Sequence, residues 1–508
     1  MSTNLSESVL KQKPIIIIIF LSLLIYLFLS FKLNVWIDEV CTIKTISHDS
    51  VNSTIKSAIN FEGQPPFYFI IAFLWAKISN SEFFLRLLSV LFTVSAGLLL
   101  FKLYRNISVT KDWLILILIF ANPFMVYIAT EIRCYSLVVL LSLLLIHIFQ
   151  KYYTDQKVPI LIRTIFIVTS IAAVNTQYFV SFILLSNAVY LMIKSNWKTF
   201  LTYMIDMFFV VASLMWVPFH IIGQLDMHLY PGINIGFKDI ISFLPERFND
   251  YIFNRHLFPY RILGYLIQLI IIFSIILSIF IKRKVKNFIA SNLYLFVQLI
   301  GLSLWFSLVY FKLGNEFLSI RHTAILFPVI FLLFIRSFDY FQNVYFKRLI
   351  IITAFSFSLI CTFNFYKLFV KDFDVLGCVK YMTTNSKETE PIVLMTNQEG
   401  LPFLYYFRKK NETYVLPYTL SDSTGFSYVK LGKALKSEEI DELLSKVNRS
   451  HNFWVLNLLK DNIHDKNLMS IDEKLNSTKY SLVADTIIGD PKNRKSFKDL
   501  HIRKFRIE

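Results

Sequence analysis

The sequence predicts an α-helical polytopic membrane protein with about eleven transmembrane helices, followed by a C-terminal soluble α/β domain. Of the 508 residues, 55% are hydrophobic and 17% are charged, and glycine and proline are scarce. The hydrophobic residues form blocks of roughly 16 to 22, close to the roughly 20 helical residues that cross a bilayer. Short charged segments separate the blocks. This composition excludes an ordinary soluble protein over most of the chain.

The first hydrophobic block, from Pro14 to Phe31, contains no charged residue. Lys11 and Lys13 precede it, as in a signal peptide, but no small-residue cleavage site follows, so we expect a retained first span. The predicted spans are residues 14–32, 83–101, 113–131, 134–150, 159–176, 178–193, 199–221, 262–281, 289–311, 320–335 and 349–367.

The loop charges predict the orientation of these spans. With a cytoplasmic amino terminus, every predicted inner loop is basic on balance, as is typical of cytoplasmic loops. These loops are KLYRNISVTK, KYYTDQK, KSNWK, KRKVK and RSFDYFQNVYFKR. The same rule explains the net charge of +17 without a nucleic-acid partner. The predicted outer loops cover residues 33–82 and 222–261, and the C-terminal part lies outside.

One hydrophobic segment, QPPFYFIIAFLWAKI at 64–78, is too short to cross a bilayer. Its core from Phe67 to Ala76 has ten residues. Counting it as a span would move every later loop to the opposite side. We therefore expect an interfacial or re-entrant helix within the first outer loop.

A change of composition near residue 369 predicts the domain boundary. Residues 1–369 form the predicted transmembrane domain, and residues 370–508 form an extracytoplasmic α/β domain. Its predicted strands are PIVLMTN, YVLPY, FWVLNLL, SLVADTII and HIRKFRI. SEEIDELLSKV, at 437–447, has helical periodicity. The sequence contains no Walker motif, so an ATP-driven pump is unsupported.

Two adjacent acids, Asp38 and Glu39, lie within the hydrophobic stretch NVWIDEVCTI at 34–43. One interpretation is that both acids lie at a solvated helix end. Alternatively, a carboxylate at the membrane surface accepts a proton from an acceptor group or holds a divalent cation. Neighbouring side chains point in different directions, so we expect only one of the two to perform a given role.

Further polar residues interrupt hydrophobic segments at four places. Taken singly, each has an ordinary explanation: a helix start, a loop ion pair, a polar turn or an arginine that reaches lipid headgroups. The residues are Glu62, Gln64 and Tyr68 in EGQPPFYF, Glu131, Arg133 and Tyr135 in ATEIRCYSL, Tyr178 in NTQY, and Arg321 and His322 in LSIRHTAILFP. By contrast, we expect Asp206 to be solvated at the membrane interface.

The predicted topology puts the candidate carboxylates and arginines on the outer membrane face. Arginines there can bind a phosphate and stabilise it as it leaves, while a carboxylate activates the attacking group. The pattern therefore predicts chemistry on a lipid-linked phosphate. The residues concerned are Asp38, Glu39, Glu62, Arg133, Tyr178 and Arg321.

The order of these motifs resembles the GT-C superfamily of membrane glycosyltransferases. Within it, the chain is most similar to family 39, which includes protein mannosyltransferases and bacterial lipid A aminoarabinose transferases. The matching pieces, over roughly residues 10–370, are WIDE, QPPFYFIIAFLWAKI, FFLRLLSVLFTV, EIRCYSL, TQYFVSFILL and RHTAILFP.

The resemblance implies residue roles. Asp38, with Glu39 beside it, matches the catalytic acidic motif. Arg133 and Arg321 match arginines expected to bind the donor phosphate. Two positions depart from the family pattern: Gln64 replaces a histidine before the two prolines, and His322 replaces a tyrosine after Arg321. The implied substrate-binding residues are Gln64, Tyr68, Glu131, Tyr135, Tyr178 and His322.

The implied reaction moves a hexose or pentose from a polyprenyl-phosphate-sugar donor to an extracytoplasmic lipid, glycan or protein acceptor, with inversion. The implied location is the cytoplasmic membrane, with membrane lipids around the spans. The resemblance implies no particular cofactor, and a divalent metal is compatible with the carboxylates although no ligand spacing demands it. The alternatives are a transporter or flippase, for which we find no internal repeat, or a polymerase of lipid-linked sugars.

Overall fold

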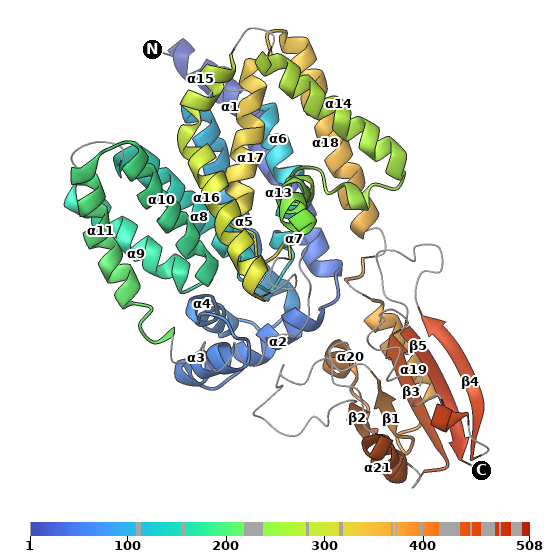
Figure 1. The fold of residues 1–508 in the computed structure, drawn as a ribbon. Helices are drawn as coiled ribbons and strands as arrows, with labels where there is room; N and C mark the ends of the chain where they lie inside the picture. Colours follow the sequence, from blue (N-terminus) through green and yellow to red (C-terminus); the bar gives the residue numbers. More distant parts are fainter. Residues whose placement is uncertain are drawn as a thin grey trace. The chain divides into compact units, whose positions relative to one another are not determined.

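The computed structural model describes residues 2–107, 113–153, 158–217, 237–280, 284–313, 319–366, 369–371, 373–395, 400–415, 437–447, 450–458, 473–476, 479–488 and 500–507. The chain forms two compact units. The first contains residues 1–31 and 45–365, and the second contains residues 32–44 and 366–508. Figure 1 shows helices throughout the first unit and the sheet of the second.

The first unit is helical. The principal helices that belong to it are α1 (Ser2–Lys32), α3 (Val51–Asn60), α4 (Phe67–Ala76), α5 (Glu82–Ile107), α6 (Leu114–Ala121), α7 (Pro123–Ala129), α8 (Tyr135–Ile148), α9 (Ile160–Val174), α10 (Ser181–Ile193), α11 (Trp197–Ala212), α13 (Phe237–Ile252), α14 (Arg261–Phe280), α15 (Val285–Ser291), α16 (Leu293–Leu313), α17 (Leu326–Ser337) and α18 (Val344–Tyr366). Short helical turns are η1 (Phe149–Tyr153), η2 (Tyr178–Val180), η3 (Arg255–Leu257) and η5 (Phe338–Tyr340).

Within the described residues, five helices are long and hydrophobic enough to cross a membrane, or six if the bent pair α15–α16 counts as one span. Five predicted spans coincide with α1, α5, α8, α14 and α18, and a sixth coincides with α16. The chain is thus a multi-pass membrane protein, but the predicted count of eleven is not confirmed. Three helices at other predicted spans are shorter than the roughly 20 residues that cross a bilayer: α9 has 15 residues, α11 has 16 and α17 has 12. Residues 218–236, which include the end of one predicted span and the start of the second outer loop, lie outside the described residues.

One predicted span, 113–131, is not a single helix. It breaks into α6 and α7 at Asn122, because Pro123 supplies no amide hydrogen to continue α6. The Asn122 side chain caps α7, accepting hydrogen bonds from the amides of Phe124 and Met125 at 2.9 and 3.3 Å. By contrast, α4 has the ten residues expected for the short hydrophobic segment.

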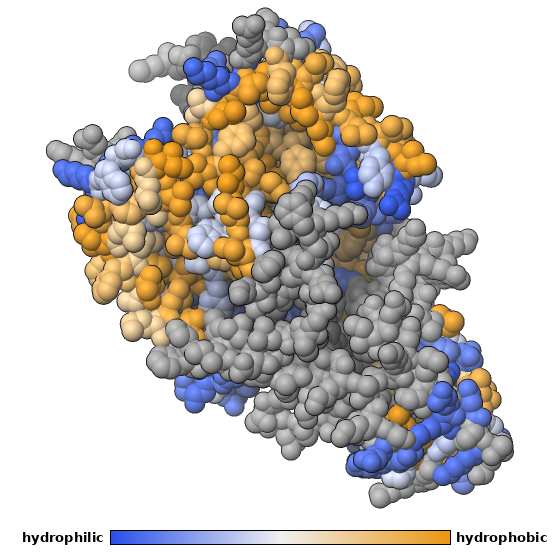
Figure 2. Space-filling model, in the orientation of Figure 1, coloured by the Kyte–Doolittle hydropathy of each residue, from blue (hydrophilic) through white to orange (hydrophobic). Residues whose placement is uncertain are grey.

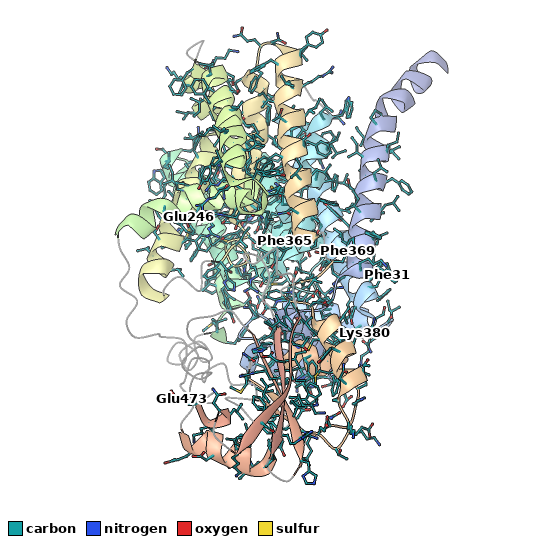
Figure 3. The ribbon with its side chains drawn as sticks, turned by 90° about the vertical axis from the view of Figure 1, so that its right-hand side faces the viewer. Phe31, Glu246, Phe365, Phe369, Lys380 and Glu473 are labelled. Carbon is teal, nitrogen blue, oxygen red and sulfur yellow. The ribbon has the colours of Figure 1, made fainter. Side chains whose placement is uncertain are left out.

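The surface of the helical unit is largely hydrophobic. Figure 2 shows these side chains spread over its visible face, and Phe208 on α11 and Ile262 on α14 are 69% and 78% exposed. Figure 3 shows α1 along one side of the helices, with Phe31 near its carboxyl end. Apolar surface of this extent is typical of helices that face lipid.

Asp206, expected to be solvated, is fully buried instead. Its carboxylate accepts hydrogen bonds from Arg163 Nη2 at 2.6 Å, from Arg163 Nε at 3.0 Å and from the Tyr153 hydroxyl at 2.5 Å. The Arg163 side chain is 25% exposed. The buried acid is thus compensated by a cation that comes from α9 and reaches the surface.

This asymmetry predicts unequal effects of breaking the pair. Arg163→Met leaves a fully buried carboxylate without its cation and is expected to destabilise the protein by roughly 3–5 kcal/mol. Asp206→Asn leaves an arginine that can turn toward water, so its effect is expected to be smaller. Thermal unfolding in detergent measures both, with the exposed Asp49→Asn as control. Equal losses for the two variants would contradict this account.

The second unit contains α2 (Ile37–Ile46), most of which belongs to it, and a five-stranded sheet of order β2-β1-β3-β5-β4. β1 (Ile392–Leu394) pairs in parallel with β2 (Thr413–Val415) and β3 (Asn452–Leu458). β5 (Leu500–Ile507) is antiparallel to β3 and to β4 (Tyr480–Ile488). All five predicted strands are confirmed.

Helices cover both faces of this sheet. Met382 of α19 (Val375–Asn385) and Phe403 of α20 (Gly400–Tyr406) belong to one core cluster with Ile392 and Trp454. Ile440, Leu444 and Val447 of α21 (Ser437–Val447), a helix predicted from the sequence, belong to the cluster on the other face. The layers are those of an α/β fold. That residues 370–508 form an extracytoplasmic domain stays a prediction.

A buried carboxylate, Glu390, connects the first core cluster to β5. It accepts hydrogen bonds from Trp454 Nε1 at 2.8 Å and the Lys387 amide at 3.1 Å, and it forms an ion pair with Lys504 at 2.7 Å. Burial by itself raises the pKa of Glu390, but the hydrogen bonds from Lys504, Trp454 and Lys387 outweigh it and lower the pKa below its usual range.

A lowered pKa in the folded state means that the carboxylate stabilises the fold above the usual glutamate pKa of about 4.3. This contribution is lost as the pH falls through that value toward the folded-state pKa. We therefore expect Glu390→Gln to lower the melting temperature at pH 7 and to reduce its decline on acidification. Melting curves between pH 7 and about pH 3 measure this, with the exposed Glu388→Gln as control. If the melting temperatures of wild type and Glu390→Gln fell equally on acidification, this would contradict the expectation.

Candidate functional site

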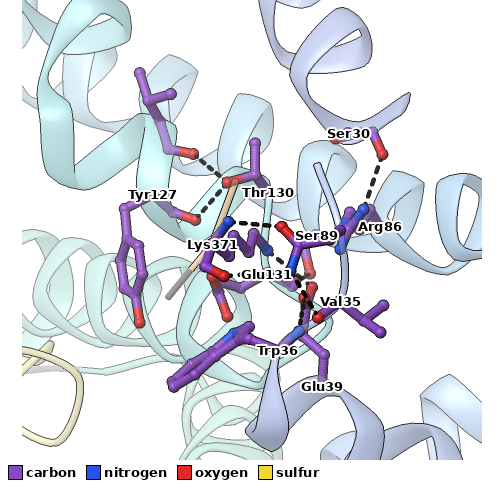
Figure 4. Close-up of polar contacts among 12 residues, drawn as sticks. Ser30, Val35, Trp36, Glu39, Arg86, Ser89, Tyr127, Thr130, Glu131 and Lys371 are labelled. Atoms are coloured by element: carbon purple, nitrogen blue, oxygen red, sulfur yellow. Dashed lines mark hydrogen bonds and ion pairs between the residues drawn. The ribbon is translucent and has the colours of Figure 1, made fainter. Parts of the chain in front are cut away.

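The two predicted acids occupy different environments in the second unit. Both lie in the first turn of α2, where carboxylates suit the helix dipole. Asp38 is partly exposed, whereas Glu39 is fully buried. Glu39 Oε2 accepts the Trp36 amide at 3.3 Å, as in half of a capping box, and Glu39 Oε1 forms an ion pair with Lys371 at 3.0 Å. Figure 4 shows this pair.

Lys371 is a residue that the sequence does not single out. It lies just after the last predicted span, where a lysine is ordinary, and it is 332 residues from Glu39. In the folded protein it is only 5% exposed. Its burial and its ion pair identify it as part of the acidic segment, which we define as residues 34–39 with Lys371 and Tyr406.

In the first unit, four of the polar segments predicted from the sequence meet. We call residues 62–68, 131–135, 175–178 and 319–323 the polar junction. Arg133 Nη1 forms an ion pair with Glu62 Oε2 at 2.7 Å, and both side chains are buried. The Phe67 amide donates to the Asn175 carbonyl at 2.9 Å.

The last segment of the polar junction joins through Gln177, whose Nε2 donates to the His322 carbonyl at 3.3 Å. Ser319 Oγ and His322 Nδ1 are 3.1 Å apart. Arg321, between them in the chain, is partly exposed. Residues far apart in sequence are therefore held together by backbone and side-chain hydrogen bonds.

The remaining predicted residues lie around these contacts. Tyr68 is buried on α4, and its ring lies 5.6 Å from that of Phe69. Gln64 follows Gly63, whose φ of 62° suits glycine, and the Gln64 amide donates to the Ala58 carbonyl. Tyr178 begins η2 and is half-buried.

Glu131 and Tyr135 lie on either side of Arg133. Glu131 is buried, and its carbonyl accepts a hydrogen bond from Ser89 Oγ at 2.5 Å (Figure 4). The Tyr135 ring centroid is 6.0 Å from the Arg133 guanidinium carbon, at the limit of a cation–π contact. These contacts fix the backbone and the side chain of Arg133's segment.

Two supporting residues were not predicted. Tyr251 of α13 donates to the Ile320 carbonyl at 3.0 Å and lies 2.6 Å from Thr323 Oγ1. Asn122 Nδ2 donates to the Tyr251 carbonyl at 2.7 Å. The Asn-Pro break between α6 and α7 thus also supports the segment that carries Arg321. In the sequence, the asparagine before a proline at Asn122 could have indicated this role, whereas no pattern singles out Tyr251.

All four cysteines are buried and free of disulfides. Among the described residues, no three His, Cys, Asp or Glu side chains are grouped so that they could hold a metal ion.

No family model matches the sequence, and no curated protein does. Among solved structures, ArnT from Cupriavidus metallidurans in the apo state is similar to this chain, with a TM-score of 0.58 at 10% identity, over 97% of this chain and 98% of ArnT. ArnT from the same organism bound to undecaprenyl phosphate gives 0.57 at 11%, with the same coverage. ArnT is a lipid A aminoarabinose transferase with the GT-C fold. Nearly the whole of this chain therefore has the GT-C fold, which confirms at the level of the fold its resemblance to that superfamily.

Proposed function

We propose that this protein is an integral membrane glycosyltransferase that moves a sugar from a polyprenyl-phosphate-sugar donor to an acceptor outside the cytoplasm, from a position in the cytoplasmic membrane. The observation that carries the proposal is the likeness to ArnT, which extends over nearly the full length of this chain and of ArnT. One of the two ArnT structures has undecaprenyl phosphate bound. The polar junction adds residue types suited to a sugar phosphate. The acceptor is a lipid, glycan or protein.

In this proposal Arg133 and Arg321 bind the donor phosphate. A guanidinium fits two phosphate oxygens at once and stabilises the charge that develops as the phosphate leaves. The ion pair with Glu62 supports the role of Arg133, because it holds the guanidinium in one orientation. The proposed substrate-binding residues are Gln64, Tyr68, Glu131, Tyr135, Tyr178 and His322.

Asp38 is the proposed general base. It accepts the proton of the acceptor hydroxyl or amine while the acceptor atom bonds to the anomeric carbon. The bond from that carbon to the phosphate oxygen breaks, and the polyprenyl phosphate leaves with the electron pair, so the anomeric centre inverts. Both carboxylate oxygens of Glu39 already have partners, Lys371 and the Trp36 amide. This supports a positioning role for Glu39, rather than the catalytic role that its place in the motif implies.

Sealed liposomes that contain the protein and a labelled polyprenyl-phosphate-sugar test the reaction class. Pentose and hexose donors are compared, with an extract of membrane acceptors added. We expect the label to leave the polyprenyl lipid only when acceptor is present. Label that stays on the intact lipid but changes leaflet, as measured by its accessibility to an external hydrolase, would contradict the proposal and favour a flippase.

A further inference from the structure

The acidic segment is attached to the part of the chain that follows the last transmembrane helix. The side-chain amide of Asn34 pairs with both backbone groups of Lys371: the Lys371 amide donates to Asn34 Oδ1 at 2.6 Å, and Asn34 Nδ2 donates to the Lys371 carbonyl at 3.2 Å. If the chain at Asn34 were shifted by one residue relative to Lys371, both hydrogen bonds would be lost. Because Asn34 is 2% exposed, an unpaired amide there would be costly.

The next residue makes a further attachment. The Val35 amide donates to the Tyr406 hydroxyl at 2.9 Å, and Tyr406 is the last residue of α20. Val35 is fully buried. The chain that leads into α2 is therefore held at two consecutive residues, and its position depends on Lys371 and Tyr406.

The ion pair between Glu39 and Lys371 completes this arrangement. Glu39 is 0% and Lys371 5% exposed, so two buried charges of opposite sign stabilise each other here. Asp38 directly precedes Glu39 in the first turn of α2. Successive helical residues point about 100° apart, so fixing Glu39 in the interior also fixes the direction of Asp38.

We propose that Lys371 is a positioning residue that orients α2 and so holds the Asp38 carboxylate in place for transfer. The inference rests on the proposed function. Without Lys371, the buried Glu39 would lose a cation that lies 3.0 Å from its Oε1, and it would move toward water and take the first turn of α2 with it. A displacement of about 1 Å in a reacting group costs on the order of 10²-fold in rate.

The first test compares Lys371→Met with Lys380→Met, a matched control on α19 whose lysine is exposed (Figure 3). We expect kcat of Lys371→Met to fall about 10²-fold while the donor KM changes less than about threefold. Lys380→Met should behave as wild type. A KM effect that equals or exceeds the kcat effect would overturn the positioning role.

The double variant Glu39→Gln/Lys371→Met separates positioning from direct chemistry by Glu39. Each single variant leaves one buried charge without the other member of its pair, whereas the double variant removes both charges. We therefore expect the double variant to be at least about tenfold more active than Lys371→Met. A double variant no more active than Lys371→Met would mean that Glu39 itself reacts, and would overturn the inference.

A measurement independent of activity uses Cys41, which is buried on α2. Mass spectrometry follows maleimide labelling of Cys41 and of Cys361 on α18 in the same sample. We expect Lys371→Met to label Cys41 about tenfold faster, by local opening, with Cys361 unchanged. An unchanged Cys41 rate, or equal acceleration of both thiols, would overturn the inference. If wild type transfers no sugar, the proposed function fails, and this labelling result still decides whether Lys371 holds α2.

Discussion

Replacing Asp38 by asparagine is expected to reduce the initial rate of sugar transfer by about 10²–10⁴-fold, the usual contribution of a general base. Asparagine keeps the size of the side chain and its partial exposure, so the fold should be preserved. The rate is measured with labelled donor and saturating acceptor in liposomes that contain equal amounts of each variant. An unchanged melting temperature would show that the loss is chemical.

Asp49→Asn is the matched control for this prediction. Asp49 is exposed in the turn between α2 and α3, eleven positions after Asp38, and should transfer at the wild-type rate. Asp38→Asn transferring as fast as Asp49→Asn would mean that Asp38 is only a solvated residue at a helix end.

The second large effect is expected at Arg133. Arg133→Met removes the cation paired with the buried Glu62, which should destabilise the protein by roughly 3–5 kcal/mol. The same change removes a proposed phosphate ligand, so donor KM should also rise. Thermal unfolding and donor titration of one preparation measure the two effects separately.

The double variant Glu62→Gln/Arg133→Met separates stability from binding at this pair. It removes both charges of the pair together, so much of the lost stability should return, as in other buried pairs replaced as a unit. Donor affinity should stay low, because the guanidinium is still absent. Recovery of both stability and donor affinity would show that Arg133 supports the fold and does not bind phosphate.

Much of the fold could be predicted from the sequence, because local patterns carry it. The ten hydrophobic residues of α4 end where the sequence predicts, and short apolar segments locate all five strands. The helix break within the predicted span 113–131 was not anticipated, because hydropathy averages over the Asn122-Pro123 break. Asp206 was misjudged for another reason: its burial depends on Arg163, which comes from a different helix.

The candidate site could be predicted only as a set of polar residues. Sequence patterns selected Glu62 and Arg133, and the structure pairs them. The partner of Glu39 could not be predicted, because Lys371 lies 332 residues away and follows no motif. Long-range ion pairs of this kind are set by tertiary packing, so composition and spacing do not reveal them.

The central claim, transfer of the sugar without its phosphate, is tested most directly by product stoichiometry. Mass spectrometry of the lipids in liposomes with labelled donor and acceptor counts what each transfer leaves behind. The account predicts one polyprenyl phosphate released for each sugar transferred by wild type, and almost none from Asp38→Asn. Free polyprenol in its place would mean that the phosphate travels with the sugar, and intact donor with no product would mean that the protein is not a glycosyltransferase of this class.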